Sequence, residues 1–252
     1  MVWQSFKMAW QAIISNKMRS FLTMLGIIIG VTALVVMVSL VDGATGEVTN
    51  QIASIGTDRI SVYVFDDKGK PLKMSDLETL ADDPAIGQVA PQTSTNYKAK
   101  YGYKSADVTL YGTTAAYETI GGVNVEYGRF LKTADVTNAT QVAVLSYSAW
   151  ERLFGTSRAL GESVRINGRE FTVVGVLEKN TSSFAFMGGQ YEIYVPFSVL
   201  SRMTGMTGVS NIHVTAADPA DNAGTEAAIN RFLLARFNND SDAFYVENMT
   251  AM

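Results

Sequence analysis

The sequence predicts an α+β protein that one N-terminal helix anchors to a membrane. An uncharged apolar run extends from Phe21 to Val41, and strand and helix patterns alternate in residues 57–117 and again in residues 209–252. The intervening residues 118–208 contain several short strand patterns. We therefore expect a transmembrane helix with a stalk, a split β-α-β domain and a small β-rich subdomain inserted into it.

The run from Phe21 to Val41 is long enough to cross a bilayer, because about 20 residues span a hydrocarbon core of roughly 30 Å. A cleaved signal peptide is the alternative interpretation. Its apolar core would be shorter, about 7–15 residues, and a small-residue cleavage site would follow it. Here Asp42 follows the run directly, which favours an uncleaved anchor.

The charges around this run predict its orientation. Lys7, Lys17 and Arg19 precede it, and no Asp or Glu occurs before Asp42. Positive flanks stay in the cytoplasm, so we expect the N-terminus inside the cell and residues 42–252 outside the cell (inner or plasma) membrane. Three of the 20 Lys and Arg precede residue 42 and all 24 Asp and Glu follow, which leaves the outer part at about −7. This balance predicts no nucleic-acid partner.

Residues 1–20 predict an amphipathic helix that lies on the membrane surface. Its apolar side chains recur at spacings of three and four, and Trp and Lys are the residues that an interfacial helix needs. The alternative is a simple extension of the transmembrane helix, but Ser15-Asn16 offers a place to turn. The shared face comprises Trp3, Phe6, Trp10, Ile13, Ile14 and Met18.

Residues 21–56 predict the transmembrane helix and its stalk. Gly26 and Gly30 lie one turn apart, and small residues at this spacing let a second helix approach closely. Beyond Asp42 an apolar stripe continues at helical spacing, so we expect the helix to run on to about Ser54. The stripe consists of Val48, Ile52 and Ile55.

The two flanking segments each indicate a strand, a helix and a strand. Alternation around Ile60 and again around Ile212 predicts half-buried strands. Ser75 with Glu78 predicts one helix start, and Asp218-Pro219 predicts the other. A polar, Tyr-rich hairpin is expected from Thr93 to Tyr111.

The inserted segment, residues 118–208, contains clearer signals for turns and for the ends of helices and strands. Residues 141–145 form an apolar strand pattern, and Gly155 ends a short helix pattern. Asn167-Gly168 is the strongest short hairpin signal. A further strand is expected over residues 191–195, and Pro196 closes it.

No motif for catalysis is present, so the sequence predicts no catalytic, cofactor-binding or metal-binding residues. It contains no phosphate-binding G-x-x-x-x-G-K-[ST] motif, no G-x-S-x-G motif and no Cys. Its single His, His213, has no second His or Cys for a metal site, which favours a structural or surface role over a ligand role.

Residues 181–190 predict either a loop that folds onto the insert or an exposed contact loop for a partner. Apolar side chains stand there among Ser and Gly, and exposed apolar groups often mark interfaces. The possible contact residues are Phe184, Phe186 and Met187.

Several segments carry a resemblance to a known family. The run NKMRSFLTMLGIIIGV at residues 16–31 resembles the start of the MacB-type permeases of ABC transporters, in the FtsX superfamily. Further segments resemble the periplasmic domain of these permeases: GRFL at 128–131 with Asp135, VAVLS at 142–146, LFG at 153–155, ALG at 159–161, INGREFTVVGVL at 166–177 and YVPF at 194–197.

The resemblance implies a Porter subdomain formed by residues 57–117 and 209–252, and a Sabre subdomain formed by residues 118–208. It also implies that a separate chain or domain supplies an ABC ATPase with its ATP and Mg²⁺. Further implied partners are a second permease copy or a paralogue and a periplasmic adaptor protein. Three later membrane helices of the family are missing from these residues, so we expect a fragment that does not transport alone.

Two functions remain open from the sequence. The first is the permease part of an exporter that couples ATP hydrolysis to movement of the outer domain, for efflux of drugs, peptides or lipids. The second is a membrane-anchored extracytoplasmic binding or sensor domain without ATPase coupling. A neighbouring ATPase gene or three downstream spans would favour the first function, and a single further span leading to a signalling domain would favour the second.

Overall fold

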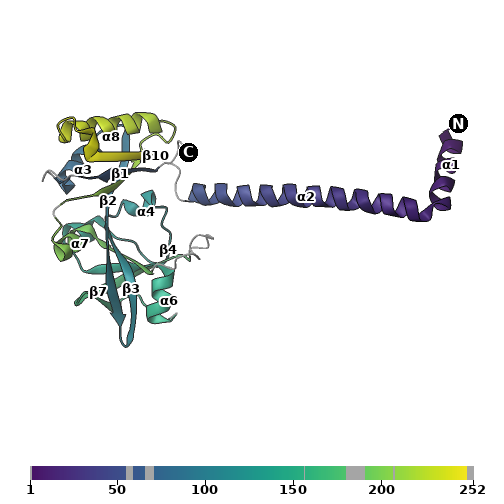
Figure 1. Cartoon of the computed structure of the whole chain (residues 1–252). Helices are drawn as coiled ribbons and strands as arrows, with labels where there is room; N and C mark the ends of the chain where they lie inside the picture. The colour runs from purple at the N-terminus through teal and green to yellow at the C-terminus, as the bar shows by residue number, and fades with distance from the viewer. Residues whose placement is uncertain are drawn as a thin grey trace. The chain divides into compact units, whose positions relative to one another are not determined.

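A computed structural model describes residues 2–54, 59–65, 71–155, 157–179, 191–206 and 208–248 of the chain. It divides into two compact units, Met1–Ala53 and Ser54–Met252. The first unit is helical and the second is a mixed α/β domain (Figure 1). The predicted fold class is thus confirmed.

The first unit consists of α1 (Val2–Ser15) and the long α2 (Lys17–Ser54). Asn16 separates the two helices, so the turn predicted at Ser15-Asn16 is confirmed. The helix α2 starts at Lys17 rather than at Phe21 and continues to Ser54, as predicted for a stalk. Residues Lys17–Gly43 are long and apolar enough to cross a membrane.

The second unit begins with a four-stranded antiparallel sheet, in the order β10-β1-β9-β2. Its helices α3 and α8 connect β1 to β2 and β9 to β10, which is the ferredoxin-like arrangement of two split β-α-β units. The predicted strand–helix–strand patterns at both ends of the domain are therefore confirmed. The elements are β1 (Arg59–Val64), α3 (Met74–Ala81), β2 (Ile86–Tyr101), β9 (Asn211–Ala216), α8 (Asn222–Arg236), the 3₁₀ turn η2 (Ser241–Ala243) and β10 (Phe244–Asn248).

One face of this sheet packs against α3 and α8. Leu77 and Leu80 of α3, and Ile229 and Leu233 of α8, join the inward residues of β1 and β9 in one core. The predicted helix starts need correction. The carboxylate of Asp76, rather than the Ser75–Glu78 pair, accepts the Lys73 N–H at 2.8 Å. Asp221 replaces Asp218 as the cap of α8, because its side chain accepts the Gly224 N–H at 2.9 Å.

The remaining strands close into a small barrel. The pairings run in a ring from β2 through β3, β8, β5, β7 and β6 back to β2, so these six strands share one interior. Apolar side chains fill it, with Phe171, Ile166 and Ile193 fully buried. The strands are β3 (Lys104–Thr113), β5 (Val142–Leu145), β6 (Ser163–Ile166), β7 (Arg169–Leu177) and β8 (Tyr191–Pro196), and β4 (Val125–Gly128) pairs with the C-terminal end of β7.

Two short helices, α6 (Tyr147–Phe154) and α7 (Phe197–Thr204), pack on the barrel strands. The helix α5 (Thr133–Thr137) packs against α7, and α4 (Tyr117–Ile120) contacts β2 and β9. The predicted helix end at Gly155 and the predicted hairpin turn at Asn167-Gly168 are confirmed. Gly155 ends α6 at φ 64°, and Asn167 and Gly168 turn the β6–β7 hairpin at φ 47° and 79°. These left-handed values are the ones that a type I′ turn requires.

The strand β2 belongs to both sheets, and this differs from the predicted division. It pairs with β9 up to Gln92 and with β3 from Thr93 onward. The hairpin β2–β3 therefore lies in the barrel, although the predicted boundary at 117/118 assigns it to the split domain. The local pattern of Thr93–Tyr111 predicts a hairpin correctly, but it carries no information on which distant strands complete the sheet.

Candidate functional site

The first candidate site is the apolar surface of α2. The most apolar stretch of Lys17–Gly43 has no buried share, and Ile27 and Leu34 are each 66% exposed. Gly26 and Gly30 lie on this helix, and a Cβ built at either position meets no atom within 4 Å. The described residues thus leave room for a second helix at both glycines, and packing against one stays a prediction.

Only two of the other predicted contact residues lie in the part of the chain that the structure describes. Val48 and Ile52 lie on the helical backbone of α2. Four others lie outside the described residues: Ile55, Phe184, Phe186 and Met187. Their proposed roles in the stalk and in a contact loop stay predictions.

The GRFL segment at residues 128–131 forms a hydrogen-bonded corner beside β7. Gly128 has φ 85°, and a Cβ there would overlap the Val174 carbonyl oxygen, so this position requires glycine. The Arg129 guanidinium donates to the Asp135 carboxylate at 2.7 Å, and the Lys132 N–H donates to the same carboxylate at 2.9 Å. Burial alone would raise the pKa of Asp135, but these hydrogen bonds and the Arg129 charge lower it below the ordinary value.

A buried hydrogen-bonded chain occupies the face of the four-stranded sheet opposite α3 and α8. Ser61 and His213 face each other across β1 and β9, with 3.1 Å between Ser61 Oγ and His213 Nδ1. His213 Nε2 lies 2.9 Å from Gln92 Oε1, and Gln92 Nε2 donates to the Tyr117 hydroxyl at 2.8 Å. The chain connects the split sheet to α4, at the point where β2 passes into the barrel.

The arrangement of Gln92 determines the tautomer of His213. The amide NH₂ of Gln92 donates to Tyr117, so its oxygen accepts from His213 Nε2–H, and His213 Nδ1 accepts from the Ser61 hydroxyl. Burial and the positive charge of Arg59 lower the pKa of His213 to about 4. His213 is therefore neutral at pH 7 and structural, which agrees with the prediction. The expected half-buried character of β1 was wrong at Ser61, which is 2% exposed.

Tyrosine rings extend this cluster across β3 and β8. The Tyr194 ring stacks on Tyr111 at 5.3 Å and lies 5.9 Å from the Tyr117 ring. The Tyr194 hydroxyl donates to the Glu192 carboxylate at 3.0 Å. Burial raises the pKa of Glu192 and of all three tyrosines. The cluster joins the barrel to α4 through packing and hydrogen bonds together.

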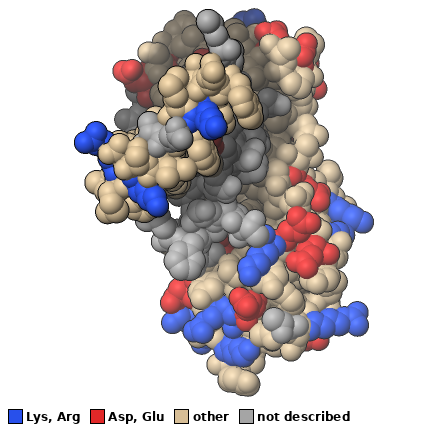
Figure 2. All heavy atoms as spheres, turned by 90° about the vertical axis from the view of Figure 1, so that its right-hand side faces the viewer, with Lys and Arg blue, Asp and Glu red and all other residues tan. Residues whose placement is uncertain are grey.

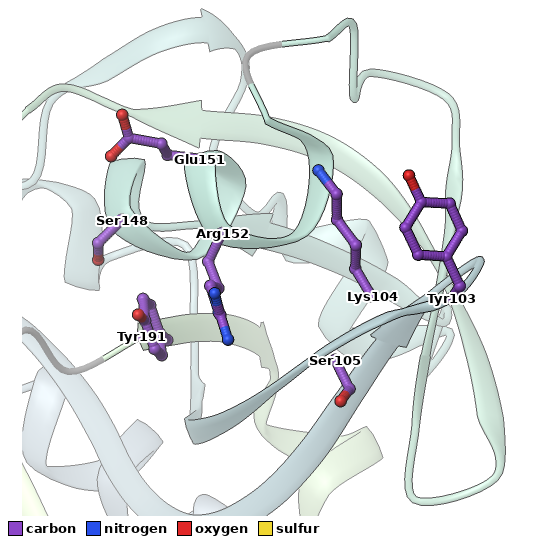
Figure 3. Close-up of a pocket in the computed structure, with 7 residues that line it drawn as sticks. All are labelled: Tyr103, Lys104, Ser105, Ser148, Glu151, Arg152 and Tyr191. Carbon is purple, nitrogen blue, oxygen red and sulfur yellow. The ribbon is translucent and has the colours of Figure 1, made fainter.

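A groove of about 780 Å³ lies between the β2–β3 hairpin, α6 and β8 (Figure 3). The Arg152 side chain extends from α6 into the space between Tyr191 and Ser105, and Lys104 lies alongside the same helix. Hydroxyl, ammonium and guanidinium groups here offer hydrogen bonds to a polar ligand. The lining residues are Tyr103, Lys104, Ser105, Ser148, Glu151, Arg152 and Tyr191.

In the part of the chain that the structure describes, no group of three or more His, Cys, Asp or Glu side chains could hold a metal ion. The sites above therefore offer packing surfaces and hydrogen-bond networks, and the absence of a catalytic centre stays a prediction.

A family model for the MacB-like periplasmic core domain matches residues 20–232. The chain belongs to this family. A curated relative is the macrolide export ATP-binding/permease protein MacB of Aggregatibacter actinomycetemcomitans, 34% identical over 98% of this chain and 39% of the relative. Another is the uncharacterized ABC transporter permease YknZ of Bacillus subtilis (strain 168), 31% identical over 98% of this chain and 64% of the relative. The chain thus spans less than two thirds of the length of either relative.

Solved structures agree with this membership of the MacB-like family. The periplasmic region of MacB from Actinobacillus actinomycetemcomitans matches with a TM-score of 0.68 and 28% identity, over 79% of this chain and 92% of that chain. The extracellular domain of YknZ matches with a TM-score of 0.64 over 75% of this chain and all of that chain, and at 24% identity it supports the fold alone. The predicted resemblance is confirmed.

Sequence reasoning missed the buried chain of Ser61, Gln92, Tyr117 and His213 that this MacB-like domain contains. One signal was available: Ser61 and His213 occupy the polar positions of two strands whose apolar positions are fully buried. The pairing of those two strands, which places the side chains opposite each other, could not be read from either segment alone.

Proposed function

We propose that this chain is the permease part of a MacB-like ABC exporter, in which ATP hydrolysis on a separate chain or domain moves the outer domain for efflux of drugs, peptides or lipids. The continuity of α2 carries the proposal. Its 38 residues correspond to about 57 Å at 1.5 Å per residue, almost twice a hydrocarbon core of roughly 30 Å. A helix of this length transmits displacement from the membrane to the residues beyond it.

The proposed partners follow from this role. An ABC ATPase supplies ATP and Mg²⁺, and a second permease copy or a paralogue packs against Gly26 and Gly30. A periplasmic adaptor protein contacts the outer domain. The name of the MacB relative supports an ATPase partner, because that relative is named as an ATP-binding and permease protein.

A helix break in the stalk tests the coupling. Proline at Thr49 removes one backbone hydrogen bond and clashes with the preceding turn, at about 3 kcal/mol. In the complete permease with its ATPase, we expect Thr49→Pro to retain ATP hydrolysis but to lose the ATP-dependent fluorescence change of a probe on a Cys at position 137. Thr49→Ala is the matched control and should behave as wild type. A probe response that persists in Thr49→Pro would contradict coupling through the stalk.

The proposed orientation has its own test. Three cations and no acidic residue precede Asp42, so residues 1–20 are proposed to be cytoplasmic. We expect an impermeant thiol reagent to label Thr137→Cys in intact cells or spheroplasts, because Thr137 is exposed on α5. Ser5→Cys should be labelled only after the cells are lysed. Labelling of Ser5→Cys with protection of Thr137→Cys would reverse the orientation.

The second candidate function is a membrane-anchored binding or sensor domain, and the groove beside α6 favours it. Its cations and hydroxyl groups suit a polar ligand, and no coupling to an ATPase would be required. The stalk experiment separates the two functions, since a binding domain would show no ATP-dependent probe response even with wild-type sequence.

A further inference from the structure

The turn between α1 and α2 forms a shallow hollow in the first unit. Asn16 interrupts the helix, and residues 14–19 line a space of about 460 Å³. Lys17 and Arg19 are two of these lining residues, and both are exposed. The hollow lies at the start of the apolar span Lys17–Gly43.

This corner carries positive charge without any compensating carboxylate nearby in the sequence. Lys17 and Arg19 line it, Lys7 lies earlier on α1, and the nearest acidic residue along the chain is Asp42. None of the three cations forms an ion pair among the described side chains. Figure 2, which views the N-terminal end, shows Lys and Arg side chains on the part nearest the viewer.

Exposed aromatic side chains accompany these cations on α1. Trp3 is 80% exposed, Phe6 63% and Trp10 59%, and the Trp3 and Phe6 rings stack at 6.3 Å. Aromatic rings of this kind settle at the level of lipid headgroups. They would hold the hollow at the depth at which phosphate groups are present.

We propose that this corner binds the headgroup of an anionic phospholipid in the cytoplasmic leaflet, with Lys17 and Arg19 as the phosphate contacts. The proposal rests on the membrane orientation given above. The bilayer supplies the ligand, because a span that begins at Lys17 places the hollow at the headgroup layer. Each cation near an anionic surface contributes about a fivefold preference for anionic lipid, so removing two should reduce the preference by roughly 25-fold at low salt.

Lipid-specific fluorescence quenching tests this assignment. The chain is reconstituted with a Trp150→Phe change, so that Trp3 and Trp10 report. Brominated phosphatidylglycerol and brominated phosphatidylcholine are compared at equal mole fractions. We expect stronger quenching by the anionic lipid for this chain and a much smaller difference between the two lipids for Lys17→Gln/Arg19→Gln, in which Lys7 remains. The matched control is Lys100→Gln/Arg169→Gln, which removes one Lys and one Arg from exposed positions of the outer domain and should keep the preference.

Three outcomes would overturn the proposal. One is equal quenching by both lipids in the unmodified corner, and another is an undiminished preference in Lys17→Gln/Arg19→Gln. The third is loss of the preference when inorganic phosphate replaces chloride at matched ionic strength, which would assign the site to a free anion. The thiol-labelling result remains interpretable in each case, so failure here is distinct from failure of the proposed topology.

Discussion

Acidification from pH 7 to pH 4 is expected to remove up to about 3 kcal/mol of unfolding free energy from the outer domain through His213. In the unfolded chain the pKa of this side chain is near 6.5, and in the folded domain it is about 4. Between these values the unfolded chain binds a proton that the folded domain excludes, so stability falls as the pH falls. The contribution is present above about pH 6.5 and is lost progressively toward pH 4.

The surroundings of His213 explain the size of this effect. The ring is 6% exposed and hydrogen-bonded at both nitrogens. Protonation would place a second donor against Ser61 and a positive charge near Arg59, whose charge already lowers the pKa. Gln92 and Tyr117, the other neighbours along the chain of hydrogen bonds, offer no carboxylate to compensate.

His213→Gln is the informative variant. At pH 7 it should destabilise the domain by about 1–3 kcal/mol, because it disrupts a buried hydrogen-bond chain. Toward pH 4 the difference from wild type should shrink or change sign, since only wild type must exclude the proton. His213 is the single His of the sequence, so no other imidazole contributes to the difference.

Urea unfolding of the full chain in detergent measures this difference. Trp3→Phe and Trp10→Phe in both proteins leave Trp150 of the outer domain as the fluorescent reporter. Glu192 acts in the opposite direction, because its raised pKa favours the folded state as the pH falls, but it is common to both proteins and cancels. A stability difference that stays constant from pH 7 to pH 4 would show that His213 is not buried as a neutral group.

Local chemistry explains which parts of this fold were predictable. Asn167-Gly168 fixes a turn through backbone preferences that act over two residues, and Gly155 ends α6 in the same way. The composition and length of the apolar run in α2 likewise predict a membrane-spanning helix. Such features need no knowledge of distant segments.

The parts that escaped prediction all depend on long-range pairing. Alternation in β1 indicates one buried face, but Ser61 on the other face is buried as well and lies within hydrogen-bond distance of His213. The strand β2 serves two sheets because its second half meets β3 and β6. Replacing residues 118–208 by a linker would therefore remove four of the six barrel strands, β5 to β8, and leave the apolar interior face of the β2–β3 hairpin uncovered.

Loss of coupled transport is expected when Gly26 and Gly30 are both changed to Leu in the complete permease with its ATPase. Added Cβ atoms at these positions meet nothing within 4 Å in this chain, and Leu is a better helix former than Gly by roughly 1 kcal/mol. Transfer of Leu into lipid is also favourable. The substitution therefore causes no damage within the chain, and any defect must arise from a second helix that can no longer approach.

The expected defect is selective. A helix displaced at Gly26 and Gly30 is displaced along its whole length, because α2 continues without a break to Ser54. Efflux and the ATP-dependent response of a probe at position 137 should fall by about 5- to 150-fold, the range of typical coupling energies, while ATP hydrolysis continues. Thr32→Leu/Ser39→Leu adds similar bulk to the opposite face of α2 and should leave both activities unchanged at equal expression. Wild-type efflux and probe response in Gly26→Leu/Gly30→Leu would mean that this face meets only lipid, because a tightly packed seam has no space for two leucine side chains.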